Sequence, residues 1–204
     1  MKVIAFIGAE GSGKDTAANY FIEHHGYQKV SFAGPLKDIA ALAFGWNREM
    51  LEGVTPESRE WRERIDPFFG VTPRYALQKI GTEMFRAHIC EDFWIRCMRR
   101  AIDTANAPVV ITDCRFENEF RFLNSIGATV VYVQRPLAEE KIPQWVRECA
   151  KKKSDTNARD LLTSCGLHPS SYELFSFAHL THVTLKNDKS IEDLKEKCSY
   201  IIEK

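Results

Sequence analysis

The sequence predicts a three-layer α/β fold in which helices cover both faces of a five-stranded parallel sheet. Residues 3–7 form a continuous apolar run that ends at a glycine, the pattern of a strand buried on both faces. Sequence with helical character separates the other expected strands, so the sheet should be doubly wound. These strands are expected at residues 29–32, 109–112, 129–134 and 182–186.

The first helix should follow the first strand directly. Apolar side chains recur at helical spacing over residues 17–22, and Gly26 supplies a stop. The later strands are unevenly spaced, which indicates two insertions that leave from the carboxyl ends of strands, the edge where open α/β sheets bind ligands. We expect one domain, with a core of residues 1–34, 106–135 and 177–204, a helical first insertion at 35–105 and a second insertion at 136–176.

The amino-acid composition limits the kinds of partner that the protein is expected to bind. The chain has 204 residues, with 28 Lys plus Arg against 28 Asp plus Glu, so no global field favours nucleic acid or a membrane surface. The six cysteines form no CxxC pair, which suits a reducing compartment. No apolar run approaches the roughly 20 residues of a membrane helix. We therefore expect a cytoplasmic protein that binds neither nucleic acid nor membrane.

The segment GAEGSGKD at residues 8–15 reads as a phosphate-binding loop. Its glycines let the backbone wrap closely around a triphosphate, Lys14 can reach the β- and γ-phosphates, and the next helix presents its positive N-terminus. Its position between a buried strand and a helix disfavours the alternative of a glycine-rich turn without a ligand. The loop predicts a P-loop NTPase fold and phosphoryl transfer from a nucleoside triphosphate. The expected ATP-binding residues are Gly11, Ser12, Gly13, Lys14, Asp15 and Thr16.

Magnesium should be held by carboxylates near this loop. Asp15 stands where most such loops have a Ser or Thr ligand, and it could instead cap the helix. Asp113 ends the expected strand at 109–112, where it could hold Mg²⁺ or cap a helix at 116–125. The expected metal ligands are Asp15, Thr16 and Asp113.

Three arginines are candidates for neutralising the transferred charge. Arg115 follows Asp113 by two residues, Arg135 leaves the strand at 129–134, and Arg147 lies in the second insertion. A well-placed arginine can accelerate phosphoryl transfer by about 10³–10⁵. With Lys14, these arginines form the expected catalytic set.

The first insertion carries a further set of candidate binding residues. Thr72 and Pro73 start a helix on which Arg74, Gln78 and Gly81 share one face, although a solvated surface helix has the same spacing. A guanidinium and an amide on one stripe suit a monophosphate and a base edge. Lys37 could equally be a surface lysine and Trp94 a core residue. The candidate acceptor-binding residues are Lys37, Arg74, Gln78, Thr82, Trp94 and Arg115.

Four segments, GSGKDTA (11–17), SFAGPLK (31–37), TPRYALQKIGTE (72–83) and ITDCRFENE (111–119), resemble the deoxynucleoside monophosphate kinases of bacteriophages and large DNA viruses. The segments occur in that family's order, and an Asp after the loop lysine is the family pattern. The resemblance implies a nucleoside monophosphate kinase fold, a monophosphate-gripping first insertion and a lid in the second. It implies ATP and Mg²⁺ as cofactors and a deoxynucleoside monophosphate as substrate. A homodimer is compatible with it.

Two other functions remain open from the sequence. Animal phosphomevalonate kinases share a similar Gly-Lys-Asp start and Asp-x-Arg strand end, although the segment at 72–83 favours a nucleotide acceptor. A non-catalytic nucleotide-binding module is the second alternative. The Asn-Lys-x-Asp sequence of GTPase switches is absent from the chain.

Overall fold

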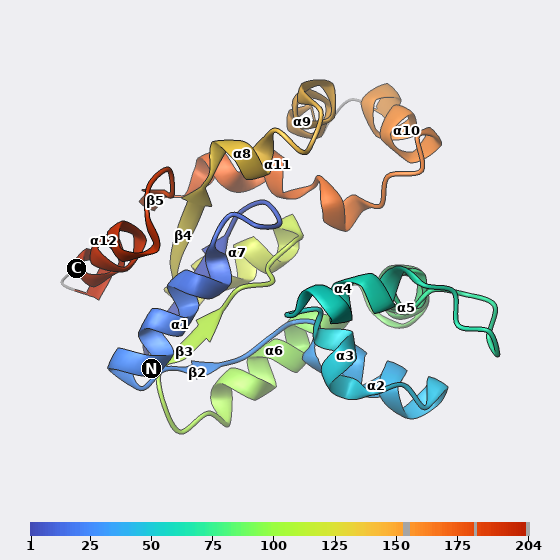
Figure 1. Ribbon diagram of the computed structural model, residues 1–204, viewed down its shortest axis with the longest axis horizontal. Helices are drawn as coiled ribbons and strands as arrows, with labels where there is room; N and C mark the ends of the chain where they lie inside the picture. The colour runs from blue at the N-terminus through green and yellow to red at the C-terminus, as the bar shows by residue number, and fades with distance from the viewer. Residues whose placement is uncertain (153–155, 182, 203–204) are drawn as a thin grey trace. The chain divides into compact units, whose positions relative to one another are not determined.

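The computed structural model describes residues 1–152, 156–181 and 183–202. It divides the chain into two compact units, one formed by Met1–Val30 with Ile102–Lys204 and the other by Ser31–Ala101. The first unit contains the sheet, and the second is helical (Figure 1).

The α-helices of the first unit are α1 (Lys14–His25), α7 (Glu117–Ser125), α8 (Pro136–Glu139), α9 (Gln144–Lys151), α10 (Thr156–Ser164), α11 (Leu174–Phe177) and α12 (Ile191–Ile202), and its 3-10 helices are η2 (Pro169–Ser171) and η3 (Ala178–Leu180). The second unit contains α2 (Gly34–Phe44), α3 (Arg48–Glu52), α4 (Pro56–Glu63), α5 (Pro73–Gln78), the π-helix η1 (Lys79–Ile89) and most of α6 (Phe93–Asp103). Among the described residues, every helix is too short or too polar to cross a membrane.

Five strands of the described residues form one parallel sheet in the order β2-β3-β1-β4-β5. The second strand is shorter than predicted, because after Val30 donates one more backbone bond to Val110 the chain leaves the sheet for the helical unit. The predicted start of the last strand, His182, lies outside the described residues. The strands are β1 (Val3–Ile7), β2 (Gln28–Lys29), β3 (Val109–Ile111), β4 (Thr129–Gln134) and β5 (Val183–Lys186).

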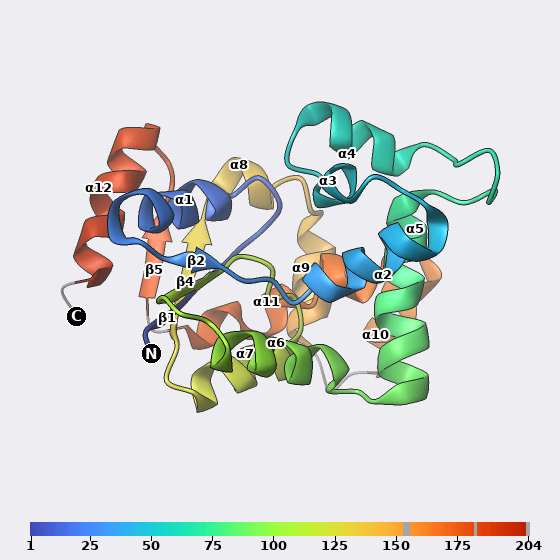
Figure 2. The ribbon, with the colours of Figure 1, turned by 90° about the horizontal axis from the view of Figure 1, so that it is seen from below.

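Helices cover both faces of this sheet, as Figure 2 shows. Ile4 and Phe6 of β1 point into a buried cluster that they share with α1 and α12. On the opposite face lie α7 and α11, where the rings of Phe120 and Phe177 stack with centroids 5.1 Å apart. Because both faces are covered, all five residues of β1 are buried. The predicted three-layer fold is confirmed, and α1 ends at Gly26 as predicted.

The helical unit has a core of its own. The ring of Trp46 stacks on Phe44 at 4.2 Å between centroids, and its Nε1 donates to Asp66 Oδ2 at 2.8 Å. The Thr72 hydroxyl accepts a hydrogen bond from the backbone N–H of Tyr75 at 3.1 Å, so α5 begins with the predicted cap. This cap fixes the start of the helix that carries the expected acceptor residues.

Helix α5 continues into η1, and this changes which residues share a face. A π-helix bonds residue i to i+5, so positions beyond Lys79 rotate away from the stripe that α-helical spacing predicts. Gly81 is buried, and a Cβ atom there would lie 3.0 Å from Leu36 Cδ2. The predicted stripe of Arg74, Gln78 and Gly81 therefore does not continue to Gly81, which packs against this chain's own α2.

Candidate active site

The phosphate-binding loop connects β1 to α1 at the carboxyl edge of the sheet. Gly8 has φ +151°, and a Cβ atom there would lie 2.5 Å from the Val133 carbonyl oxygen of β4. Gly13, with φ +101°, is the N-cap of α1 and makes no side-chain capping bond. Asp15 lies inside the first turn, so the interpretation of Asp15 as the helix cap is wrong. Glycine lets the loop lie close to β4 and leaves the helix N-terminus available to an anion.

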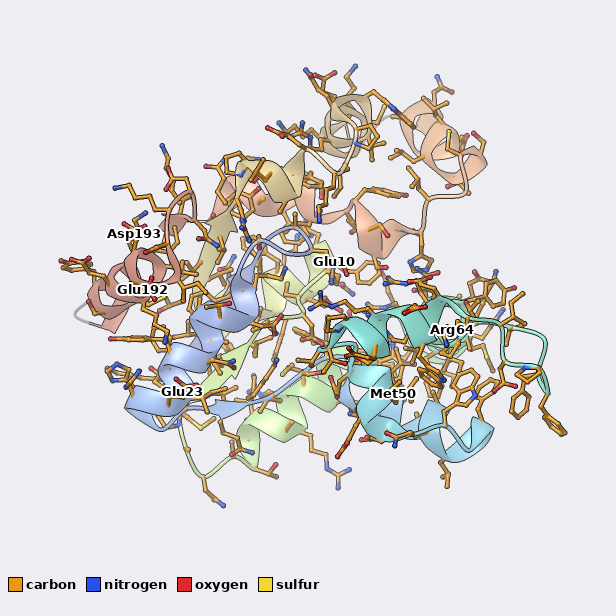
Figure 3. The ribbon with its side chains drawn as sticks, viewed as in Figure 1. Glu10, Glu23, Met50, Arg64, Glu192 and Asp193 are labelled. Carbon is orange, nitrogen blue, oxygen red and sulfur yellow. The ribbon has the colours of Figure 1, made fainter. Side chains whose placement is uncertain are left out.

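Lys14 is the most perturbed cation of this unit. It is only 7% exposed, and its Nζ donates to the carbonyl oxygen of Ala9 at 2.6 Å. Burial, reinforced by the positive charge of Arg115, lowers the pKa of Lys14 to about 7, although the nearby carboxylates of Asp15 and Glu10 oppose the shift. Glu10 lies on the same loop (Figure 3). A bound anion would relieve the repulsion between these two cations beside the start of α1.

Asp15 is held as an anion by two other elements. Its Oδ1 accepts from Lys29 Nζ at the end of β2 (2.8 Å) and from the Thr112 hydroxyl after β3 (2.9 Å). Burial raises the pKa of Asp15, but the bond and charge of Lys29, the bond from Thr112 and the charge of Lys14 outweigh it, so the pKa lies below its ordinary value. An ionised carboxylate therefore stands beside the loop lysine.

The end of β3 brings Asp113 and Arg115 to the same edge of the sheet, and both are half-buried. Buried Glu119 fixes this turn, because its Oε2 accepts from the backbone N–H groups of Arg115 (2.7 Å) and Phe116 (3.1 Å). The N-cap of α7 is Phe116, so the alternative of Asp113 as the cap is wrong.

The two remaining arginines occupy different surroundings. Arg135 Nη1 donates to the Gly11 carbonyl oxygen at 3.2 Å, which places this guanidinium at the phosphate loop. Arg147 Nη1 of α9 lies 3.7 Å from Glu139 Oε2. The other carboxylate oxygen, Glu139 Oε1, accepts a hydrogen bond from the Tyr132 hydroxyl at 2.6 Å. Burial and the adjacent Glu139 raise the pKa of Tyr132, so it stays protonated and donates to that carboxylate.

The second insertion shares a hydrophobic core with the loop. Ala9 is 2% exposed and packs in one cluster with residues of α8, α9, α10 and α11. Its carbonyl oxygen also accepts the Lys14 bond. Packing of the second insertion is thus connected directly to the position of Lys14.

In the helical unit, the expected acceptor cations are paired with carboxylates. Lys37 Nζ lies 2.6 Å from Glu52 Oε2, and Arg74 Nε pairs with Glu63. The Arg74 and Glu63 side chains are 37% and 53% exposed. Gln78 and Thr82 are half-buried. An anion that binds Arg74 must therefore compete with a carboxylate of the same unit.

Residues 70–159 match the family model for deoxynucleotide monophosphate kinase. A putative deoxynucleotide monophosphate kinase of Acanthamoeba polyphaga mimivirus is 30% identical over 207 residues, covering 95% of this chain and 92% of the relative. The chain belongs to the deoxynucleotide monophosphate kinase family. The resemblance found in the sequence is confirmed.

Two further proteins are similar to this chain at lower sequence identity. The deoxynucleotide monophosphate kinase of enterobacteria phage T4 is 22% identical over 259 residues, with 97% of each chain covered. The crystal structure of TT1252 from Thermus thermophilus is similar at a TM-score of 0.50 and 20% identity, over 99% of this chain and 96% of that chain. At that identity the likeness shows a shared fold alone.

Trp94, one of the candidate acceptor-binding residues, is a core residue in this structure. Its side chain is 2% exposed, and its Nε1 donates to the Gly81 carbonyl oxygen at 2.8 Å. Its ring packs against Phe85 and Phe93 at 5.0 and 4.8 Å between centroids. The indole holds η1 against α6 and is not available to a ligand.

Sequence reasoning missed Lys29 and Asn187. Each stands at the carboxyl end of a strand, Lys29 as the last residue of β2 and Asn187 just after β5. Lys29 bonds Asp15, and Asn187 Nδ2 donates to the Ser12 carbonyl oxygen at 2.8 Å. Asn187 directly follows the strand expected at 182–186, and that position was a signal because the ends of parallel strands meet at one edge. Lys29 gave no such signal, because it stood at the start of the strand expected at 29–32.

Proposed function

We propose that this protein transfers the γ-phosphoryl group of ATP to a deoxynucleoside 5′-monophosphate, giving ADP and a deoxynucleoside diphosphate. Membership of the deoxynucleotide monophosphate kinase family supports the reaction class. The observation that carries the proposal is the buried Lys14 in the phosphate loop with Arg115 beside it. The acceptor oxygen is already a phosphate oxygen, so the reaction needs positioning and charge neutralisation more than a general base.

The donor triphosphate binds the loop from Gly11 to Thr16. Backbone N–H groups at the start of α1 donate to phosphate oxygens, and Lys14 leaves the Ala9 carbonyl oxygen for the β- and γ-phosphates. Arg115 and Arg135 neutralise charge at the transferred group, and Arg147 does so from α9 once it leaves Glu139.

The residues at the sheet edge suit a magnesium ion. Mg²⁺ is usually held by one or two carboxylates together with substrate phosphates and water. Asp15 offers an ionised carboxylate whose two described bonds both go to Oδ1, Thr16 adds a hydroxyl, and Asp113 adds a second carboxylate after β3. A magnesium ion held by these residues would supply charge neutralisation to the substrate phosphates.

The acceptor binds the helical insertion at residues 35–105, through Arg74, Lys37, Gln78 and Thr82. The cations hold the monophosphate, and the amide and hydroxyl reach a base edge or the sugar. The second insertion at residues 136–176 acts as the lid. Its packing on Ala9 supports that role, because a change in the lid then reaches the lysine-bearing loop.

The direct test offers purified protein ATP, magnesium and each of the four deoxynucleoside monophosphates, while ADP release is followed. Phosphomevalonate serves as the competing acceptor. We expect ADP release above the ATP-only background with at least one monophosphate and none with phosphomevalonate. Background rates with all four monophosphates would overturn the proposal, and turnover with phosphomevalonate alone would reassign the acceptor.

A further inference from the structure

Asn187 connects the last strand to the phosphate loop. It follows β5 directly and is 9% exposed. Its backbone N–H donates to the Gln134 carbonyl oxygen of β4 at 2.8 Å, and its side-chain Nδ2 donates to the Ser12 carbonyl oxygen at the same distance. The backbone bond anchors Asn187 in the sheet, so the side chain holds the loop from a fixed point.

The bond to Ser12 also sets the direction of a loop amide. In a trans peptide the carbonyl of one residue and the N–H of the next lie in one plane and point in opposite directions. No cis peptide occurs in the described residues. When Asn187 draws the Ser12 carbonyl toward β5, it turns the Gly13 N–H to the other side, away from Asn187. Gly13 is the N-cap of α1, so this N–H stands where the helix meets an anion.

The close fit of Asn187 accounts for the glycine at position 13. A Cβ atom on Gly13 would lie 2.4 Å from Asn187 Nδ2 and 3.3 Å from Leu194 Cδ2. Two other loop carbonyls, those of Ala9 and Gly11, accept from Lys14 and Arg135. Three side chains thus engage loop carbonyls. Asn187 alone among the three is neutral, so it can hold the loop without competing for phosphate as a cation would.

We propose that Asn187 is a positioning residue for the ATP phosphates, acting through the Ser12–Gly13 peptide. In this role Asn187 makes the junction between β5 and α12 part of the donor site, although the Asn187 side chain itself touches no phosphate. Figure 3 shows the first turn of that helix at Glu192 and Asp193. The inference rests on the proposed function for the identity of the donor, since it deepens the account of the same loop.

Two substitutions and one matched control test this role. Asn187→Leu keeps the approximate shape of the side chain and removes the donor, and Asn187→Ala removes both. Lys197→Met is the control, because Lys197 Nζ donates to the Lys186 carbonyl oxygen at 2.7 Å, a comparable bond at the same junction. Dissociation constants are measured by titration calorimetry for ATP and for inorganic tripolyphosphate, without acceptor. Circular dichroism melts report folding.

We expect both Asn187 variants to bind ATP and tripolyphosphate about five- to twentyfold more weakly, by similar factors for the two ligands. The control should stay within about twofold. In turnover, the KM for ATP should rise while the KM for the acceptor stays unchanged, a split that general destabilisation would not produce. Asn187→Leu keeps the test decisive if Asn187→Ala fails to fold.

Unchanged affinity in a folded Asn187 variant would overturn the inference. A loss confined to ATP, with tripolyphosphate unaffected, would also overturn it, because it would identify a contact to the nucleoside. A wild-type protein that binds triphosphate but phosphorylates no monophosphate would refute the proposed function while leaving this binding test intact. A wild-type protein that binds neither ligand would refute both.

Discussion

The cations at the sheet edge and those in the helical unit have opposite surroundings. At the sheet edge, Lys14 is buried, bonds a backbone carbonyl and faces another cation, Arg115. In the helical unit, Arg74 is partly exposed and paired with Glu63. A cation held against its own solvation and beside a like charge is prepared for an anion, whereas a cation with a carboxylate partner must exchange it. Under the proposed function, the difference predicts a preorganised donor site and an acceptor site that binds by exchange.

The largest effect should come from removing the loop cation. Lys14→Ala should lower kcat/KM by at least about 10³-fold, because the substitution removes the loop cation that is proposed to bind the β- and γ-phosphates. Steady-state kinetics measure the loss, and far-UV circular dichroism should show an unchanged fold. Lys141→Ala, at an exposed position of the second insertion, is the control. Substantial activity in Lys14→Ala would contradict the role proposed for Lys14 in binding the donor phosphates.

Arg115 should come next. Arg115→Ala should lower kcat about 100-fold, because it removes a charge that stabilises the transferred group. It should also raise the pKa of Lys14, since Arg115 is one cause of its depression. Arg121→Ala on α7 is the matched control, as that side chain is 76% exposed and paired with Glu117. Equal kinetic losses in the two variants would contradict the role given to Arg115.

Two variants test whether the monophosphate replaces Glu63 as the partner of Arg74. Arg74→Ala should raise the KM for the monophosphate about tenfold with little change in kcat at saturation. Glu63→Gln should lower that KM by about twofold, because a half-exposed ion pair is worth less than about 1 kcal/mol. Arg64→Ala, in an exposed pair with Glu60, controls for surface charge. An increase in the acceptor KM of Glu63→Gln would refute exchange with that carboxylate.

The pH dependence of ATP binding provides an effect whose sign is predicted. With a pKa of about 7, Lys14 is mostly neutral above pH 7 in the free protein, and a bound triphosphate raises that pKa. ATP affinity should therefore fall as pH rises from 7 to 9, by at most about tenfold per unit. Calorimetry at pH 8 in buffers of different ionisation enthalpy should detect proton uptake in the wild type and none in Lys14→Arg. Absence of uptake in the wild type would contradict the depressed pKa.

The sequence predicted what is encoded locally. The apolar run at residues 3–7, the loop glycines and the Thr72 cap depend on near neighbours, and the structure has them where expected. The family resemblance could also be recognised from the sequence, because several short segments match the family. These local features account for the correct prediction of the fold class and of the loop between β1 and α1.

The contacts that complete the site are long-range and were missed. The Asp15 carboxylate meets Thr112 across 97 positions, and Asn187 meets Ser12 across 175. From the sequence, Trp94 could be an acceptor-binding residue or a core residue, and its burial and its bond to Gly81 decide between them. The change from α-helix to π-helix at Lys79 likewise altered a stripe that 3.6-residue spacing had predicted.

The central claim is that the phosphoryl group moves from ATP to a deoxynucleoside monophosphate. Incubation with ATP labelled at the γ-phosphate and each monophosphate, followed by separation of the nucleotides, measures that transfer directly. The account predicts label in a deoxynucleoside diphosphate for wild type and none for Lys14→Ala. Label that appears only as inorganic phosphate, or that remains in ATP with all four monophosphates, would contradict it.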